Sequence, residues 1–503
     1  MIEQLSLDFN DGNKTEEIIF SHDKVFSDFE RRRLESNFQS KLEESSAFNR
    51  NLVSFQGNKK TSVHNWFKYR EGFSTQLVES LLNKFNLDGN SVVLDPFSGS
   101  GTTAITANKL GYSSIGIDIL PVAKLTYETK KEILNYDVLE LIKIRNDIKK
   151  LKIGETNQNF NYITITEGAF SKKTEGELVY LSNYIKDSTY STLSKKLVQF
   201  LLMSILEEIS FTRKDGQYLR WDYRSNKVVQ ANIKRFEKGQ PPLKTKLDKG
   251  ELPSVKVALL KIFNSVIEDI SWAQKNNPML NENPKKNKSE FIEGSALFKL
   301  PLMREKSVNA VVTSPPYANR YDYTRTYALE LNFLGINDEK IKLLRQNLLS
   351  ATVENKSKLI QLEEFYNEIG QIDRFKSLKQ VYESNLTMKE ILGALKKRDS
   401  LGEVNNSGII RMIEGYFTEL TFVYGELFRV CESGSYVAIV NDNVRYAGEI
   451  IPVDFISCQI AEAIGFEVCK VYTLPQKKGN SSQQMKKYGK ANLRKSITVW
   501  KKK

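Results

Sequence analysis

Cysteine and histidine are both scarce, since the 503-residue chain contains three cysteines and two histidines. None of the cysteines, Cys431, Cys458 and Cys469, belongs to a C-x-x-C pair. Three isolated cysteines predict neither a disulfide framework nor a redox motif. Two histidines without a cysteine pair also argue against a zinc site.

Long apolar runs are missing as well. The stretch LVQFLLMSIL is shorter than a membrane span, and Glu207 and Glu208 follow it directly. The first residues, MIEQLSLDFNDG, are acidic, whereas a signal peptide begins with basic residues. We therefore expect a cytoplasmic protein without a membrane anchor.

Positive charge and apolar residues are plentiful instead. The net charge is +13, the isoelectric point is about 9.2, and 40% of the residues are hydrophobic. A chain of this size and composition can bury a large core and predicts more than one lobe. The excess of lysine and arginine favours a polyanionic partner such as nucleic acid, although charge alone does not decide this.

Residues 90–121, NSVVLDPFSGSGTTAITANKLGYSSIGIDILP, form the first informative motif. The pattern predicts a buried strand that ends at Asp95, a turn with Gly99 and Gly101, a helix, and a second strand that ends at Asp118. Such a β-α-β unit is typical of a nucleoside site, because glycines let the backbone approach a ligand and the second acid can bind ribose hydroxyls. A glycine-rich turn alone would fit any tight turn that needs positive φ.

The stretch DPFSGSGTT differs from phosphate-binding loops in two ways. It lacks the Gly-Lys-Ser/Thr ending, and its first residue is an acid that would repel a pyrophosphate. Acids at positions 95 and 118 suit a cationic cofactor with a methionine amino group and a ribose, which describes S-adenosyl-L-methionine. The segment resembles motif I and the motif II acid of class I methyltransferases. The resemblance implies cofactor contacts from Asp95, Pro96, Phe97, Gly99, Gly101, Thr102, Asp118 and Ile119.

The second informative motif is TSPPY, residues 313–317, which follows two β-branched residues. The two prolines fix φ and remove two N–H donors, so the Ser314 hydroxyl and a proline carbonyl are held as oriented acceptors. An exocyclic amine of a nucleobase needs such acceptors, because its lone pair is delocalised into the ring. Tyr317 could stack on a base that has left the duplex. A lone Pro-Pro turn could also simply close a strand.

TSPPY resembles motif IV of the amino-group DNA methyltransferases, which methylate cytosine N4 or adenine N6. The resemblance assigns catalysis to Ser314, Pro315, Pro316 and Tyr317. In that family serine at the first position is more usual for cytosine N4, and aspartate or asparagine for adenine N6, so cytosine N4 is favoured. Methylation of cytosine at carbon 5 needs a cysteine nucleophile, generally before a proline, and none of the three cysteines precedes one.

Two weaker segments agree with this resemblance. Residues 64–85 resemble motif X, a helix with an N-terminal loop that closes over the cofactor, and Phe67 and Ser74 are its candidate residues. Ser74 is also the expected helix N-cap, and an ordinary amphipathic helix would show the same pattern. Residues 291–300 resemble motif III, in which Ser295 approaches the adenine.

The family resemblance implies an α/β fold, a Rossmann-like class I methyltransferase sheet of seven mostly parallel strands with an antiparallel last strand. Helical insertions for target recognition interrupt this catalytic domain. Residues 1–60 form an N-terminal extension, either a packed arm or a partly disordered tail. We expect the catalytic domain at 61–135, 286–335 and 410–503, and insertions at 136–285 and 336–409.

The insertion at 136–285 is the candidate target-recognition region. Its stretch FTRKDGQYLRWDYRSNK mixes basic and aromatic residues that could contact DNA, although a solvated hairpin with aromatics packed beneath it would look the same. A lysine-rich loop at 476–496 is expected to touch the DNA backbone. The candidate DNA-binding residues are Arg213, Lys214, Arg220, Trp221, Arg224, Arg320, Lys477 and Lys478.

The sequence therefore predicts a bacterial-type, S-adenosyl-L-methionine-dependent methyltransferase of double-stranded DNA, most consistent with cytosine N4. It would be the modification enzyme of a restriction-modification system, with a cognate endonuclease acting on the same site. The alternatives are adenine N6 methylation, RNA base methylation and a non-catalytic DNA-binding scaffold. Asp95, Asp118 and the Ser-Pro-Pro-Tyr turn argue against the scaffold, which would not need all three. The recognised sequence and the oligomeric state are not predicted.

Overall fold

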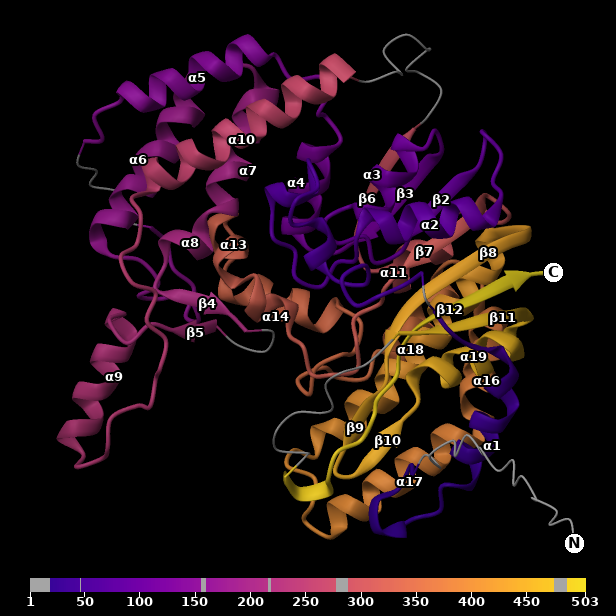
Figure 1. Cartoon of the computed structure of the whole chain (residues 1–503). Coiled ribbons are helices and arrows are strands. Elements are labelled where there is room, and N and C mark those ends of the chain that lie inside the picture. The colour runs from indigo at the N-terminus through magenta and orange to yellow at the C-terminus, as the bar shows by residue number, and fades with distance from the viewer. Residues whose placement is uncertain (1–18, 46, 155–159, 216–218, 277–287, 475–485) are drawn as a thin grey trace, which may run out of the picture.

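A computed structural model of the chain describes residues 19–45, 47–154, 160–215, 219–276, 288–474 and 486–503. Within these residues one sheet holds eight strands in the order β1-β11-β12-β8-β7-β2-β3-β6 (Figure 1). From one edge to the other the strands are β1 (Leu42–Glu44), β11 (Phe466–Thr473), β12 (Lys495–Lys502), β8 (Cys431–Asp442), β7 (Val308–Thr313), β2 (Val92–Asp95), β3 (Ser113–Asp118) and β6 (Ser289–Glu293).

The sheet has the predicted mostly parallel arrangement with one additional strand. Only β12 among the described strands of this sheet runs antiparallel to its neighbours, β8 and β11, which confirms the antiparallel last strand. The expected number of seven strands is exceeded because β1 of the N-terminal extension pairs in parallel with β11, with Leu42 opposite Val471. Part of the extension thus covers an edge that would otherwise expose unpaired backbone groups.

Helices cover both faces of the sheet, and the alternation of side chains along each strand decides which face a residue meets. Val93 and Val312 pack toward α2 (Thr75–Phe85) on one face. Leu94 and Val311 pack toward α18 (Gly408–Val430) and α19 (Val453–Ile464) on the other. The central strands are therefore buried on both sides, as expected for parallel strands between two helical layers. The helix α3 (Thr102–Lys109) joins β2 to β3.

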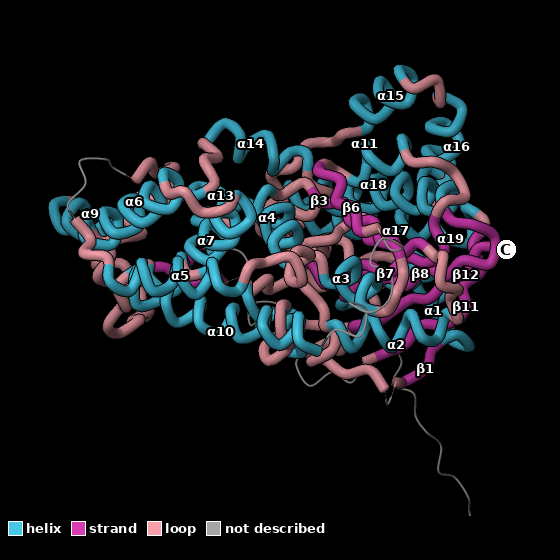
Figure 2. The backbone as a smooth tube through the Cα atoms, turned by 90° about the horizontal axis from the view of Figure 1, so that it is seen from above, coloured by secondary structure: helices cyan, strands magenta, loops and turns pink. Residues whose placement is uncertain are grey.

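The first insertion forms a helical lobe beside the sheet, visible at the left of Figures 1 and 2. Its helices share a core separate from that of the sheet domain, with fully buried Leu141, Leu178, Leu201 and Phe263. A short hairpin, β4 (Thr212–Lys214) and β5 (Leu219–Trp221), lies at its end. Its helices are α5 (Val138–Lys150), α6 (Lys172–Asp187), α7 (Thr192–Ser204), α8 (Leu206–Ile209), α9 (Asn226–Glu237) and α10 (Val255–Asn276).

The second insertion does not behave as one unit. Ile341 of α14 (Asp338–Asn347) belongs to the core of the helical lobe, together with residues of α4 (Pro121–Lys130) and α13 (Ala328–Phe333). The helices after it pack on the sheet domain, where Leu362, Phe375 and Ile391 join the core around α18. They are α15 (Leu359–Glu368), α16 (Ile372–Glu383) and α17 (Leu386–Ser400). Two short helices, α11 (Ala296–Lys299) and α12 (Tyr323–Thr326), precede the insertion and lie on either side of β7 in the sequence.

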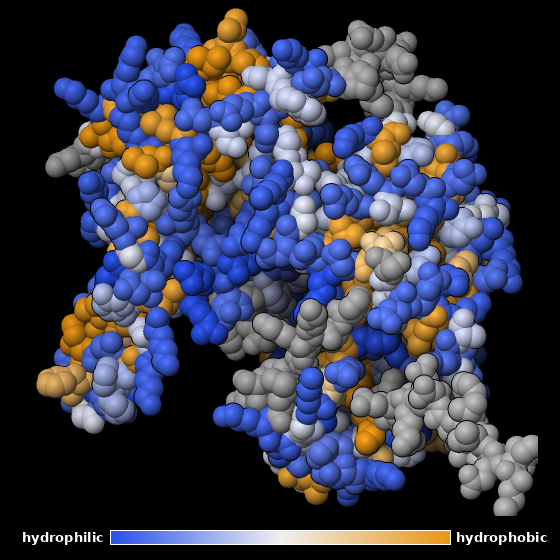
Figure 3. All heavy atoms as spheres, viewed as in Figure 1, coloured by the Kyte–Doolittle hydropathy of each residue, from blue (hydrophilic) through white to orange (hydrophobic). Residues whose placement is uncertain are grey.

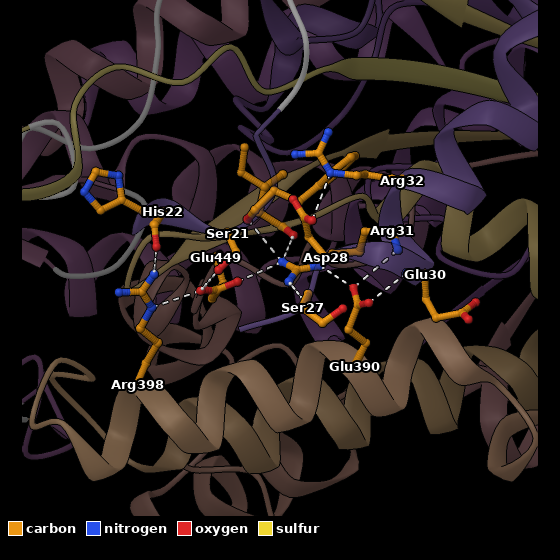
Figure 4. Close-up of polar contacts among 12 residues, drawn as sticks. Ser21, His22, Ser27, Asp28, Glu30, Arg31, Arg32, Glu390, Arg398 and Glu449 are labelled. Atoms are coloured by element: carbon orange, nitrogen blue, oxygen red, sulfur yellow. Dashed lines mark hydrogen bonds and ion pairs between the residues drawn. The ribbon is translucent and has the colours of Figure 1, made fainter. Parts of the chain in front are cut away.

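The described part of the N-terminal extension is a packed arm rather than a tail. Its helix α1 (Phe29–Phe38) carries Arg31, which is fully buried and donates from Nε to Glu390 of α17 at 2.9 Å (Figure 4). Arg31 Nη1 also donates to Glu449 at 2.9 Å, and Arg398 Nε donates to the other oxygen of Glu449 at the same distance. Glu449 begins β10 (Glu449–Ile451), which forms a hairpin with β9 (Val444–Tyr446). These ion pairs tie the arm to α17 and to this hairpin.

In the part of the chain that the structure describes, no helix has both the length and the apolar composition needed to cross a bilayer.

Candidate active site

The carboxyl ends of β2, β3, β6 and β7 meet around one cavity that is open to solvent. In a parallel sheet this end, next to the point where the strand order reverses, is where ligands bind. Motif I and the Ser-Pro-Pro-Tyr turn both contribute to the wall of this cavity. The predicted site residues that line it are Asp95, Pro96, Phe97, Gly99, Thr102, Asp118, Ile119, Ser295, Ser314 and Pro316.

Glycine is required at two positions of the motif I turn. Gly99 and Gly101 have φ of +50° and +81°, in the left-handed region. A Cβ on Gly99 would lie 2.8 Å from the ring of Tyr69, and one on Gly101 would lie 2.6 Å from the ring of Tyr127. Both the backbone conformation and the close approach therefore exclude a side chain. Gly101 precedes α3 and packs against Tyr127 instead of lining the cavity, which differs from its predicted cofactor contact.

The two acids of motifs I and II hold the turn from both ends. Asp118 accepts hydrogen bonds from the backbone N–H of Gly99 at 2.8 Å and of Leu120 at 2.9 Å. Asp95 accepts from the N–H of Phe97 at 3.0 Å and from the Thr313 hydroxyl at 2.6 Å, which links motif I to the strand before the Ser-Pro-Pro-Tyr turn. Burial raises the pKa of each acid to about 6. A cationic ligand would favour the charged form of both.

The motif X segment contributes its loop rather than the two predicted residues. Ser74 caps α2 as predicted, since its side chain accepts a hydrogen bond from the N–H of Leu77, but it is buried away from the cavity. Phe67 packs against the rings of Phe200 and Tyr327. The cavity is instead lined by the residues between them, Tyr69, Glu71, Gly72 and Phe73.

Glu71 is a site residue that sequence reasoning missed. Its half-buried carboxylate accepts hydrogen bonds from the hydroxyls of Tyr321 and Tyr327, and the loss of solvent around it raises its pKa. It adds a third carboxyl group to the cavity beside Asp95 and Asp118. The available signal was that Glu71 is the only acid in HNWFKYREGFS, between two basic residues and the helix cap. Three carboxyl groups in one apolar-walled cavity fit a ligand that carries positive charge.

The Ser-Pro-Pro-Tyr turn is held by local and distant hydrogen bonds. Ser314 Oγ donates to the Tyr317 hydroxyl at 3.0 Å and lies 3.4 Å from the carbonyl of Val440 in β8. Tyr446 of the β9–β10 hairpin donates to the carbonyl of Ala318, directly after the turn, at 2.6 Å. Ser314 and Pro316 line the cavity, whereas Pro315 is buried behind them. The turn therefore presents Ser314 to the same space as the motif I residues.

The candidate DNA-binding residues of the first insertion occupy different environments. Arg213 is exposed on β4. Arg220 pairs with Asp215, and Arg224 donates to both carboxylate oxygens of Asp222 at 2.9 and 2.7 Å. Arg213 and Arg220 are exposed and Arg224 is partly exposed, so all three arginines lie at the surface. Trp221 of β5 is partly buried, and the Lys227 ammonium lies 4.6 Å from the centre of its ring.

Lys214 does not fit its predicted contact with DNA. Its ammonium is buried, pairs with Glu330 of α13 and lies 4.6 Å from the ring of Tyr327. If Lys214 moved outward to contact DNA, the buried carboxylate of Glu330 would lose its charged partner. Arg320 lies at the surface with its guanidinium 6.0 Å from the ring of Tyr446. Lys477 and Lys478 fall outside the described residues.

Comparisons with known proteins identify the family. The family described as DNA methylase matches residues 11–129. The chain is 52% identical to the Type II methyltransferase M.BsoBI of Geobacillus stearothermophilus, over 96% of this chain and 94% of that protein. It is 37% identical to the Type II methyltransferase M.AvaI of Nostoc sp., over 93% of this chain and 92% of that protein. No solved structure matches the chain.

A further relative matches over a shorter stretch, the Type II methyltransferase M.MjaII of Methanocaldococcus jannaschii, with 41% identity over 17% of this chain. The alignments with these two relatives span nearly the whole chain and so include most of the two insertions. The three carboxyl groups and the glycine turn of the cavity fit a cationic nucleoside cofactor. The chain thus belongs to the amino-group DNA methyltransferases, as a type II DNA methyltransferase of a restriction-modification system that uses S-adenosyl-L-methionine as methyl donor.

Proposed function

We propose that this enzyme methylates cytosine N4 in duplex DNA, at a base turned out of the helix. The observation that carries the proposal is that Ser314 lines the same cavity as Asp95 and Asp118, so an amine held by Ser314 faces the cofactor cavity. Serine at this position favours cytosine over adenine within the family. A restriction endonuclease that acts on the same site is the proposed cellular partner.

The residues of the turn would prepare the amine for transfer. Ser314 Oγ donates its own proton to Tyr317, so its lone pairs are free to accept an N–H of the target amine. A proline carbonyl supplies a second acceptor and draws the nitrogen toward a tetrahedral form. When bound, the cofactor would supply an electrophilic methyl group and leave as a neutral thioether. The amine nitrogen would gain this methyl group, become cationic and then lose one proton to solvent.

Product analysis tests this proposal. Purified enzyme should convert plasmid DNA from a host without DNA methylation into DNA that contains N4-methylcytosine, and should leave folded RNA unmodified. Digestion to nucleosides and mass spectrometry distinguish this product from N6-methyladenine. N6-methyladenine would establish the adenine alternative, methylated RNA the RNA alternative, and the absence of any product the scaffold alternative.

Replacing Asp118 with alanine should weaken cofactor binding while the protein stays folded. Loss of a charged acceptor for the ribose hydroxyls should cost about 1.5–3 kcal/mol, or about 10- to 150-fold in affinity.

The cofactor affinity of the unaltered enzyme should also depend on pH. Because the pKa values of Asp95 and Asp118 are both about 6, this affinity should fall as the pH drops from 7 to 5 and the two carboxylates become protonated. Isothermal titration with the cofactor across this pH range measures both effects.

A matched control is Asp137→Ala, which removes a carboxylate that likewise accepts two backbone hydrogen bonds, but at the exposed N-cap of α5. It should leave cofactor affinity unchanged. Equal affinity for Asp118→Ala and the unaltered enzyme would remove Asp118 from the cofactor site.

The proposed DNA surface combines the two sides of a hollow. Figure 3 shows this hollow between the part of the helical lobe that carries α9 and the part of the sheet domain that carries the β9–β10 hairpin, with hydrophilic residues at its upper end. We place DNA contacts on the arginines and Trp221 of the β4–β5 region, on Arg320 after the Ser-Pro-Pro-Tyr turn, and on the lysine-rich loop. The residues of this proposal are Arg213, Arg220, Trp221, Arg224, Arg320, Lys477 and Lys478.

Binding through phosphates predicts a steep dependence on salt. If roughly 6–10 phosphates are engaged, affinity for duplex DNA should fall about 10³- to 10⁵-fold between 50 and 200 mM salt. Fluorescence anisotropy with a labelled duplex measures this slope. A flat dependence, or tighter binding of folded RNA than of duplex DNA, would speak against a duplex substrate.

A further inference from the structure

A charge pair lies directly behind the catalytic turn. Lys495 is the first residue of β12 and faces Asp442, the last residue of β8, in the register of the two strands. Its ammonium lies 3.4 and 3.5 Å from the two carboxylate oxygens of Asp442. The side chains of Lys495 and Asp442 are 14% and 33% exposed, so water reaches the pair only partly.

The same ammonium reaches Tyr317. It lies 5.2 Å from the centre of the Tyr317 ring, which is a cation–π contact. The Tyr317 hydroxyl in turn accepts the hydrogen bond from Ser314 Oγ. A continuous chain of polar contacts thus runs from Asp442 through Lys495 and Tyr317 to Ser314.

We propose that Lys495 and Asp442 are positioning residues for the methyl transfer, and that they act on the target amine through Tyr317 and Ser314. The Lys495 ammonium lies against the Tyr317 ring and so fixes the position of the tyrosine side chain and of its hydroxyl oxygen. The Tyr317 oxygen then accepts the hydrogen bond that the Ser314 hydroxyl donates, which keeps the serine lone pairs directed at the amine. This inference rests on the proposed role of Ser314 and goes beyond it, because it adds two residues outside the Ser-Pro-Pro-Tyr turn.

Asp442 has a separate electrostatic task. The target nitrogen becomes cationic during methyl transfer, and a nearby unpaired ammonium would oppose this charge. With Asp442 in place the pair has no net charge. Asp442 therefore allows a cation to orient Tyr317 without raising the barrier of a reaction that creates positive charge.

The position of Lys495 in the chain connects this pair to DNA binding. Lys495 lies at the end of the lysine-rich segment 476–496, where β12 begins, and its carbonyl accepts a hydrogen bond from the N–H of Leu474, just before that segment. A contact between the loop and DNA would therefore act on a segment that also carries the orienting ammonium. A purely structural clamp between β8 and β12 would need no contact with Tyr317.

Single-turnover methyl transfer under saturating DNA and cofactor tests the proposal with Lys495→Met, Asp442→Asn and the double variant. Lys495→Met should slow the transfer step by about 10²-fold, the typical effect of a misplaced reacting group. Asp442→Asn should slow it at least as much, because it leaves the ammonium unpaired. The double variant should be no slower than Asp442→Asn, and Lys495→Arg should recover part of the rate.

Two further measurements separate positioning from mere structure. In a Ser314→Ala background, Lys495→Met should cause little additional loss, because both residues act on the same hydrogen bond. The melting temperature and cofactor affinity should hardly change, since a partly exposed pair contributes little to stability. Lys501→Met is the matched control: Lys501 also lies on β12 with its ammonium 5.3 Å from a tyrosine ring, but contacts Tyr436 rather than the catalytic turn.

Three results would overturn the proposal: a wild-type transfer rate for Lys495→Met, a fully additive loss in the Ser314→Ala background, or a loss of DNA affinity with a normal single-turnover rate. The last result would assign Lys495 to phosphate contact. Nucleoside analysis of the unaltered enzyme is run in parallel. A product other than N4-methylcytosine from that enzyme contradicts the proposed function, whereas the rates of the variants decide on the charge pair.

Discussion

Replacing Ser314 with alanine is expected to slow methyl transfer by about 10²- to 10³-fold, by analogy with the removal of one oriented group that stabilises a transition state. The physical reason is that the amine loses the acceptor that draws its nitrogen toward a tetrahedral form. Cofactor affinity should hardly move, because the acids and the glycine turn of motif I remain in place. Single-turnover kinetics with labelled cofactor, together with a cofactor titration, measure the two quantities separately.

The control for this prediction is Ser435→Ala. Ser435 lies on β8, and its hydroxyl donates to the carbonyl of Val308 at 3.0 Å, so the same substitution removes a comparable hydrogen bond near the opposite end of the strand. It should keep the rate of methyl transfer. If Ser314→Ala keeps it too, or loses cofactor binding instead, the assignment of the Ser-Pro-Pro-Tyr turn to catalysis is wrong.

Replacing Arg31 with methionine is expected to lower the free energy of unfolding by about 3–5 kcal/mol, the typical cost of removing one partner of a buried ion pair. The substitution leaves Glu390 and Glu449 charged in the interior, with Glu449 still paired to Arg398 (Figure 4). Denaturant unfolding, followed by fluorescence, measures the effect. Because none of the hydrogen-bond partners of Arg31 lines the cavity, folded variant protein should still bind the cofactor.

Arg33→Met provides the comparison on the same helix. Arg33 is exposed and pairs with Glu30 at 3.5 Å, so its loss should change stability by no more than about 1 kcal/mol. Equal stabilities of the two variants would show that the buried network does not hold the arm in place.

The parts of the site that the sequence could predict are those encoded in contiguous residues. The glycine turn after Asp95 and the Ser-Pro-Pro-Tyr turn after β7 each combine a strand end with residues of restricted φ, so their shape follows from local chemistry. The N-cap at Ser74 is local in the same sense. The order of these motifs along the chain then indicated the strand arrangement that the structure shows.

The parts that could not be predicted depend on partners far away in the sequence. The strand β1 has three residues, too few for a recognisable period, and exists because β11 offers it an edge. The sequence around Lys214 does not distinguish it from a surface lysine. It is buried because the packing of α13 places Glu330 and Tyr327 against it. Arg31 belongs to the run RRR, which suggests a solvated surface, yet Glu390 and Glu449 lie more than 350 residues further on.

The most direct test of the central claim is the identity of the methylated nucleoside in DNA from cells that express this enzyme. Plasmid DNA should be isolated from a host without methylation of its own, after expression of the unaltered enzyme and, in parallel, of Ser314→Ala. Digestion and mass spectrometry should reveal N4-methylcytosine with the unaltered enzyme and only traces with the variant. N6-methyladenine, or the same amount of N4-methylcytosine from both proteins, would contradict the account.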